Sequence, residues 1–128
     1  MVEDLVLKFV KFSVVGISGL AIDFGITWLV KEVLKGNKYI ANSLGFSLAV
    51  VNNYLWNKYW TFQDADPAFL EQFGKFLAIS TLGLLINNLI IYVLNRHINF
   101  YLAKLFAIVI VVIWNFIMNY TYAFSNSY

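Results

Sequence analysis

Asparagines placed four residues apart stand out among the side chains that could do chemistry. Asn53 and Asn57 form one such pair, and Asn115 and Asn119 repeat it 62 residues later. Residues four apart share one face of a helix, so each pair predicts a stripe of carboxamides, which both donate and accept hydrogen bonds. Such a stripe can contact a hydroxyl-rich ligand, or it can join helices through bonds worth on the order of 1 kcal/mol each in lipid. For any single asparagine taken alone, we expect the packing role.

An acidic residue, Asp23, falls inside an apolar stretch. It precedes Trp28 and Lys31 by a few residues, which at 1.5 Å per residue places it roughly 10 Å inside a membrane. A carboxylate at that depth costs several kcal/mol unless it is paired or protonated. Two hypotheses follow: a structural ion pair with Lys104, or a role in binding substrate or a proton. Asn87 occupies the equivalent position in the second half of the chain.

The residue sets that typify catalysis are missing from the sequence. There is one histidine, His97, and no cysteine. The sequence contains no HExxH motif, carboxylate cluster, GxSxG elbow or glycine-rich phosphate loop. We therefore predict that the chain is not an enzyme by itself and has no catalytic residues, no metal site and no cofactor. Its net charge of +2 without a basic stripe argues against a nucleic-acid partner.

Membrane-spanning helices must position these residues. The chain is 61% hydrophobic and 12% charged, with a mean hydropathy of +0.72, and 128 residues cannot bury that much apolar surface in water. The composition predicts an all-α integral membrane protein. Between the second and third apolar stretches, Asp66-Pro67 and the apolar residues that follow predict a short interfacial helix. Four stretches have about the length that crosses a bilayer: 9–30, 39–56, 76–94 and 101–120.

The sequence also repeats itself. The repeat predicts one domain over 1–128 that is built from two parallel two-helix units, about 8–62 and about 72–124, with function expected where the repeats meet. The charges on the two sides do not decide the orientation. In the first helices Lys11-Phe12, Gly19 and Asp23 recur as Lys75-Phe76, Gly83 and Asn87, and in the second Ala41, Asn53, Asn57 and Phe62 recur as Ala103, Asn115, Asn119 and Phe124.

One motif carries a resemblance to a known family. Lys11-Phe12 with Gly16, Asp23, and above all Asn53-Tyr54 followed by Asn57-Lys58-Tyr59-Trp60-Thr61-Phe62 resemble the GtrA family of small four-helix membrane proteins, over nearly the whole chain. The family often has two basic residues where this chain has Asn57 and Lys58. The resemblance implies a polyprenyl-phosphate partner and translocation of a lipid-linked sugar for cell-surface polysaccharide modification. It also implies an inner-membrane location with both termini and the Trp-Thr-Phe loop in the cytoplasm.

A carrier of such a lipid needs cations at headgroup depth, a polar route for the sugar and a lipid-facing opening for the tail. Lys11 and Lys75 occupy matching helix starts, where ammonium groups and helix N-termini favour phosphate, and Lys58 joins them. These lysines can equally extend to ordinary anionic lipid. Four helices make a thin wall, so a homo-oligomer is plausible. The candidate substrate-binding residues are Lys11, Asp23, Asn53, Asn57, Lys58, Lys75, Asn87, Asn115 and Asn119.

Three alternatives come from other functional classes. A non-catalytic subunit that anchors a polyprenyl-phosphate glycosyltransferase would need the aromatic loop but not Asp23. A small multidrug exporter would share four helices and an acid in the first, but the internal repeat and the Trp-Thr-Phe end argue against it. A glycosyltransferase enzyme would transfer sugar from a nucleotide donor in a purified sample.

Overall fold

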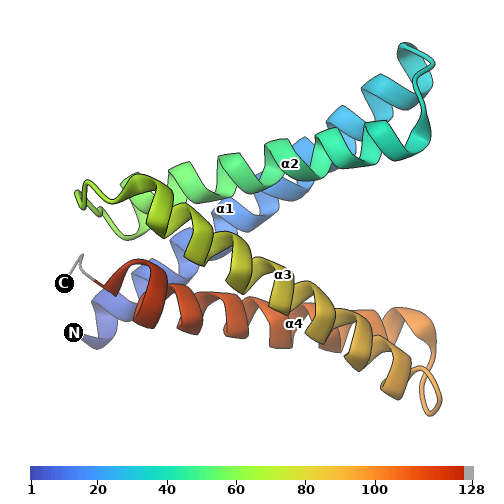
Figure 1. Ribbon diagram of the computed structural model, residues 1–128. Coiled ribbons are helices and arrows are strands. Elements are labelled where there is room, and N and C mark those ends of the chain that lie inside the picture. The colour runs from blue at the N-terminus through green and yellow to red at the C-terminus, as the bar shows by residue number, and fades with distance from the viewer. Residues whose placement is uncertain (126–128) are drawn as a thin grey trace. The chain divides into compact units, whose positions relative to one another are not determined.

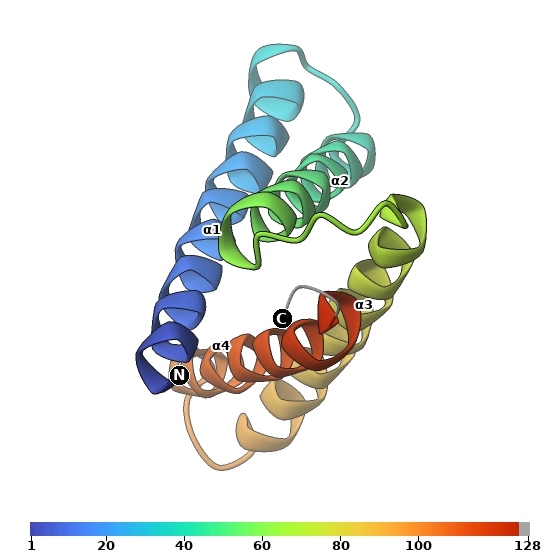
Figure 2. The same ribbon diagram turned by 90° about the vertical axis from the view of Figure 1, so that its left-hand side faces the viewer.

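Two compact units make up the computed structural model, which describes residues 1–125 (Figure 1). Unit 1 covers residues 1–65, and unit 2 begins at Asp66. Each unit is a pair of helices that run side by side in opposite directions, as Figure 2 also shows. The described residues contain helices and connecting segments but no strand. The predicted all-helical fold is confirmed.

Unit 1 pairs α1 (Val2–Trp28) with α2 (Lys38–Trp56), and each helix continues into a π-helical turn, η1 (Leu29–Val33) and η2 (Asn57–Thr61). The Asn37 side chain caps α2 by accepting from the backbone N–H of Tyr39 at 2.8 Å, as asparagine often does at this position. Phe12 of α1 meets Phe62 edge-to-face, with ring centroids 6.4 Å apart. We call the end of a unit where its two phenylalanines meet the aromatic end. The opposite end, where the chain turns from the first helix to the second, is the hairpin end.

Unit 2 repeats this plan with α3 (Phe69–Leu94), α4 (Phe100–Met118) and the π-helical turn η3 (Asn119–Ala123). Asn99 caps α4 by accepting from the Leu102 N–H at 2.8 Å. Phe76 and Phe124 close its aromatic end, with ring centroids 6.5 Å apart. Both second helices thus begin with a capping asparagine and end in a π-helical turn that starts at an asparagine.

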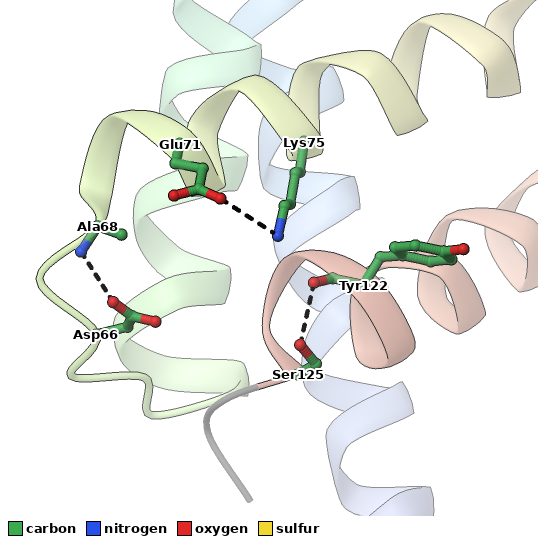
Figure 3. Close-up of polar contacts among 6 residues, drawn as sticks. All are labelled: Asp66, Ala68, Glu71, Lys75, Tyr122 and Ser125. Atoms are coloured by element: carbon green, nitrogen blue, oxygen red, sulfur yellow. Dashed lines mark hydrogen bonds and ion pairs between the residues drawn. The ribbon is translucent and has the colours of Figure 1, made fainter.

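The expected interfacial helix is not a separate element. Its residues form the first turns of α3, which runs unbroken from Phe69 to Leu94. The chain's single proline, Pro67, precedes the helix, so nothing within α3 interrupts the backbone hydrogen bonds. The Asp66 carboxylate accepts from the Ala68 N–H at 2.9 Å just before α3 begins (Figure 3).

Three segments are by themselves long and apolar enough to cross a membrane: Val2–Val33, Phe69–Leu94 and Leu102–Ala123. The fourth helix, α2, is less apolar because it carries Asn42, Asn52 and Asn53 together with serines. It nevertheless packs against α1 within unit 1. The chain is therefore a multi-pass integral membrane protein.

Small residues fill the seam between the helices of each unit. Ala41, Gly45 and Ala49 are buried on α2, and Ala103 and Ala107 are buried on α4. Small side chains let helix backbones approach closely in lipid, where packing replaces the hydrophobic driving force between helices. Most large apolar side chains point outward instead, as contact with lipid tails requires. The polar residues that remain in the seams are the candidates for a functional site.

Candidate functional site

In unit 1, a polar seam forms where Gly19 of α1 faces Asn53 of α2. A Cβ at Gly19 would collide with the Asn53 carboxamide, so glycine is what lets the amide approach. The Asn52 amide group donates to Ser18 Oγ at 3.1 Å and to Asn53 Oδ1 at 3.3 Å. The Asn53 oxygen therefore has a donor within its own unit. Neither Asn52 nor Ser18 was predicted from the sequence, although two consecutive asparagines, Asn52 and Asn53, are a signal that could have indicated them.

Unit 2 has an equivalent glycine, Gly83, but no equivalent of the Asn52 side-chain donor. A Cβ at Gly83 would lie 2.6 Å from Asn115 Oδ1, so the amide packs against the glycine as in unit 1. Trp114 takes the place of Asn52, and its indole N–H donates to the Ile79 carbonyl at 3.2 Å. Asn115 Oδ1 is buried and accepts no hydrogen bond from the described part of the chain.

One turn further, the two units differ in the same way. In unit 1, Asn57 Oδ1 accepts from the Thr61 hydroxyl at 2.8 Å. In unit 2, Ala123 stands where Thr61 would be, and it has no hydroxyl. Asn119 is fully buried and its amide group donates to the Asn115 backbone carbonyl at 2.7 Å. Within residues 1–125, no donor reaches Asn119 Oδ1.

Among its described residues, unit 2 therefore holds two buried amide oxygens without a partner, one helical turn apart. An unsatisfied buried acceptor costs roughly 1–3 kcal/mol, and a membrane offers no bulk water to relieve it. Both oxygens can accept hydrogen bonds from hydroxyl groups that the described chain does not supply. The predicted asparagine stripes thus split into a satisfied pair, Asn53 and Asn57, and an unsatisfied pair, Asn115 and Asn119.

Asp23 lies half-buried in the seam of unit 1, facing Gly45. Its carboxylate accepts from the Thr27 hydroxyl at 3.4 Å, and a Cβ at Gly45 would lie 2.7 Å from the carboxylate. Asn87 is half-buried at the equivalent position of α3. The expected pair with Lys104 would join the two units and stays a prediction.

The two lysines at matching helix starts differ in their contacts. Lys11 is half-buried, with its ammonium group 5.3 Å from the centre of the Trp60 ring, a cation–π contact. The Lys75 side chain is exposed and lies 3.8 Å from Glu71, one turn earlier on α3 (Figure 3). Exposed pairs of this kind contribute little to stability, so the Lys75 ammonium is accessible.

Lys58 is held inside the protein. It is 2% exposed and its ammonium lies 3.6 Å from the carboxylate of Asp64, whose side chain is fully buried. The Asp64 N–H also donates to the Lys58 carbonyl at 2.7 Å, just after η2. The sequence pattern predicted a phosphate-binding role for Lys58 and gave no role to Asp64. An acid two residues after the Trp-Thr-Phe end was the signal available.

No group of three or more histidine, aspartate or glutamate residues that could hold a metal ion occurs in the described part of the chain. The polar groups that the structure gathers are amides, hydroxyls and the single ion pairs above. Such groups bind ligands by hydrogen bonds and charge.

Comparisons with known proteins identify relatives of this arrangement. The family model "GtrA/DPMS, transmembrane domain" matches residues 11–124. A dolichol-phosphate mannosyltransferase of Pyrococcus furiosus is 32% identical over 110 residues, which cover 84% of this chain and 31% of that protein. The uncharacterized membrane protein YngA of Bacillus subtilis is 29% identical over 118 residues, which cover 91% of this chain and 79% of that protein. The chain thus spans less than a third of the mannosyltransferase.

Proposed function

This chain belongs to the GtrA/DPMS transmembrane-domain family, and from that premise we propose that it moves a polyprenyl-phosphate-linked sugar across the membrane for cell-surface polysaccharide modification. The observation that carries the proposal is the pair of buried amide oxygens on Asn115 and Asn119 that lack donors in the described chain. A sugar offers several hydroxyl donors, and a site built to hydrogen-bond hydroxyls recognises them strongly.

The two asparagine pairs have different roles in this proposal. Asn53 and Asn57 hold the helices of unit 1 together, because their oxygens already accept from Asn52 and Thr61. Asn115 and Asn119 contact the passing sugar in unit 2. Asn87 lies four residues beyond Gly83 on α3, about 6 Å toward the hairpin end, and extends the polar route in that direction. In unit 1, Asp23 contacts the sugar or carries a proton.

Lys11 and Lys75 receive the phosphate in this scheme. Both lie near the aromatic end of their unit, and an ammonium group at headgroup depth would attract a lipid phosphate. Lys58 is engaged with Asp64, so its part is to hold the Trp-Thr-Phe end of unit 1 in place. No step in this passage makes or breaks a covalent bond, and we propose that the chain is not itself an enzyme.

The orientation follows from the same proposal. Each unit crosses the membrane twice, so both aromatic ends belong on the face that carries the glycosyl lipid before transport, which we take to be the cytoplasmic face of the inner membrane. A cysteine at Gln63 should then react with an impermeant thiol reagent only from the cytoplasm, and one at Gly36 only from outside. The opposite labelling pattern would reverse the direction of transport.

One comparison favours a second candidate function. In the mannosyltransferase from Pyrococcus furiosus, the matching region is under a third of the protein, so a domain of this kind accompanies a much longer chain there. By analogy, this chain would be a non-catalytic membrane subunit that anchors a separate glycosyltransferase. Such a subunit would need the helices but no route for the sugar.

Transport by the purified protein separates the two functions. The protein is reconstituted alone into vesicles that contain a labelled polyprenyl-phosphate-linked hexose, and exposure of the sugar on the opposite face is followed over time. The carrier proposal predicts protein-dependent exposure without any glycosyltransferase. Exposure at the rate of empty vesicles, together with binding of a glycosyltransferase, would favour the anchoring function.

A further inference from the structure

A groove at the hairpin end of unit 2 lies apart from the asparagine seam. It has a volume of about 450 Å³ and is lined by Asn88, Ile91, Tyr92, Asn95, Arg96 and Phe100. Asn88, Ile91 and Tyr92 share one face of the last two turns of α3, and Asn95, the C-cap residue of that helix, continues the same face. Arg96 and Phe100 close the groove from the connection and from the start of α4.

No acidic side chain near this groove comes from the last turns of α3, from the connection after it or from α4. Arg96 is the chain's single arginine, and no acidic residue follows Glu71 in the sequence. The Arg96 guanidinium donates to the Tyr92 hydroxyl and lies 4.6 Å from the centre of its ring. A guanidinium has five N–H donors in a planar fork that fits phosphate oxygens. The contact with neutral Tyr92 leaves most of these donors and the whole charge available.

Polar side chains in the groove extend along the end of α3. Asn88 precedes Asn95 by seven residues, which corresponds to about 10 Å along the helix. The Asn88 side chain is exposed, and an amide exposed to lipid is unfavourable unless something hydrogen-bonds it. Tyr92 and Phe100 supply exposed aromatic surface beside it.

Unit 1 offers an internal comparison. Its own groove near the hairpin end, of about 300 Å³, is lined by Tyr39, Ile40, Ser43, Leu44 and Ser47. The ammonium of Lys38 lies 5.0 Å from the centre of the Tyr39 ring, but no cation lines the groove itself. The combination of a guanidinium, two amides and two aromatic rings in one groove is therefore specific to unit 2.

We propose that the unit 2 groove binds the phosphate and sugar of a glycosylated polyprenyl phosphate on the side opposite the aromatic end. Arg96 holds the phosphate, the amides of Asn88 and Asn95 hydrogen-bond sugar hydroxyls, and the sugar ring rests against Tyr92 or Phe100. The identity of the lipid rests on the proposed function, in which this groove is the release site. The prenyl tail lies along the lipid-facing side of α3.

Equilibrium binding to the purified full-length protein in detergent tests the groove with three probes: a polyprenyl-phosphate-linked hexose, phosphatidylglycerol and inorganic phosphate. Arg96→Gln should weaken binding of the hexose lipid about tenfold or more, as expected for loss of a charge-assisted hydrogen bond. The matched control, Lys38→Gln, removes a cation over a tyrosine in unit 1 and should change affinity by less than twofold. Asn88→Leu is a second variant, since leucine suits a lipid-facing position and should leave folding intact while it lowers affinity.

Unchanged affinity in both Arg96→Gln and Asn88→Leu would overturn the proposal. If the variants lose affinity for phosphatidylglycerol by the same factor, the proposal is also overturned, because the groove would then bind ordinary anionic lipid. Binding of inorganic phosphate without binding of the hexose lipid would overturn it as well. Binding is measured without transport, so the two proposals fail separately. Groove binding in a protein that transports nothing would refute the proposed function alone. Transport together with normal binding by both Arg96→Gln and Asn88→Leu would refute the groove alone.

Discussion

Gly83 packs directly against the Asn115 carboxamide, so that a Cβ at Gly83 would lie 2.6 Å from Asn115 Oδ1. Gly19 and Asn53 make the same contact in unit 1. In each unit a glycine on the first helix thus admits an asparagine of the second helix into the seam. The repeat seen in the sequence as matching residue types is present in the structure as a matching contact.

This contact predicts the effect of adding one methyl group. Gly83→Ala should destabilise the protein by about 1–3 kcal/mol, the usual consequence of overpacking, as measured by unfolding in detergent. Gly74→Ala on the same helix is the control. A Cβ there meets nothing within 4 Å, and alanine favours helix over glycine by about 1 kcal/mol. Equal destabilisation by both substitutions would contradict the close packing at Gly83.

Because Lys58 and Asp64 form an ion pair, substitutions of the two residues should not be additive in their effect on the free energy of unfolding. Lys58→Met alone leaves a buried carboxylate without its cation, and Asp64→Leu alone leaves a buried ammonium, so each should lower the free energy of unfolding by about 3 kcal/mol. The double variant should recover most of that loss, because a buried pair is often dispensable when both charges go together. If the losses simply add, the pair is not what holds this end of unit 1.

Substitution of Lys11 or Lys75 should weaken lipid binding. Lys11→Ala and Lys75→Ala should each weaken binding of a polyprenyl phosphate by about 1 kcal/mol, the contribution of one interfacial charge, when titrated in detergent micelles. Lys31→Ala, at the hairpin end of unit 1, serves as the control for a general change in charge. Unchanged binding in the Lys11 and Lys75 double variant would reduce both residues to contacts with ordinary lipid.

Substitution of Asp23 tests whether the residue is needed for transport rather than for folding. Asp23→Asn should fold normally, since the Thr27 hydroxyl can donate to an amide oxygen as it does to the carboxylate, and Asn87 occupies the equivalent position of α3. If Asp23 contacts sugar or carries a proton, transport into vesicles should nevertheless collapse. A well-folded Asp23→Asn protein that transports at the wild-type rate would leave Asp23 with a structural role only.

Much of the fold could be predicted from the sequence because it depends on composition and spacing. The apolar stretches indicated four helices, and the Lys11-Phe12 and Asn53 motifs indicated the family. One feature of the fold was predicted wrongly. The interfacial helix is not a separate element, because α3 runs unbroken from Phe69 to Leu94.

The site was harder to predict because hydrogen bonding depends on neighbours that spacing alone does not reveal. Asn57 and Asn119 are equivalent in sequence, yet Thr61 satisfies one oxygen and Ala123 cannot satisfy the other. Lys58 is similar in kind to Lys75, but Asp64 folds back onto it after η2. Such differences emerge only when the side chains of both partners are placed.

The transport rate of Asn119→Leu tests the central claim most directly. Leucine removes a buried oxygen that has no donor in the described chain. It also removes the amide donor to the Asn115 carbonyl, but that carbonyl still accepts from the Asn119 backbone N–H, so the variant should fold about as well as wild type. Asn57→Leu is its matched control in the other unit. It strands the Thr61 hydroxyl and should lose about 1–3 kcal/mol of stability.

Both variants are reconstituted into vesicles beside the wild-type protein, and exposure of a labelled polyprenyl-phosphate-linked hexose on the far face is timed. The account predicts that Asn119→Leu is well folded and transports at about one tenth of the wild-type rate or more slowly, because one hydrogen bond to a sugar hydroxyl is missing from the route. A well-folded Asn119→Leu protein that transports at the wild-type rate would contradict it.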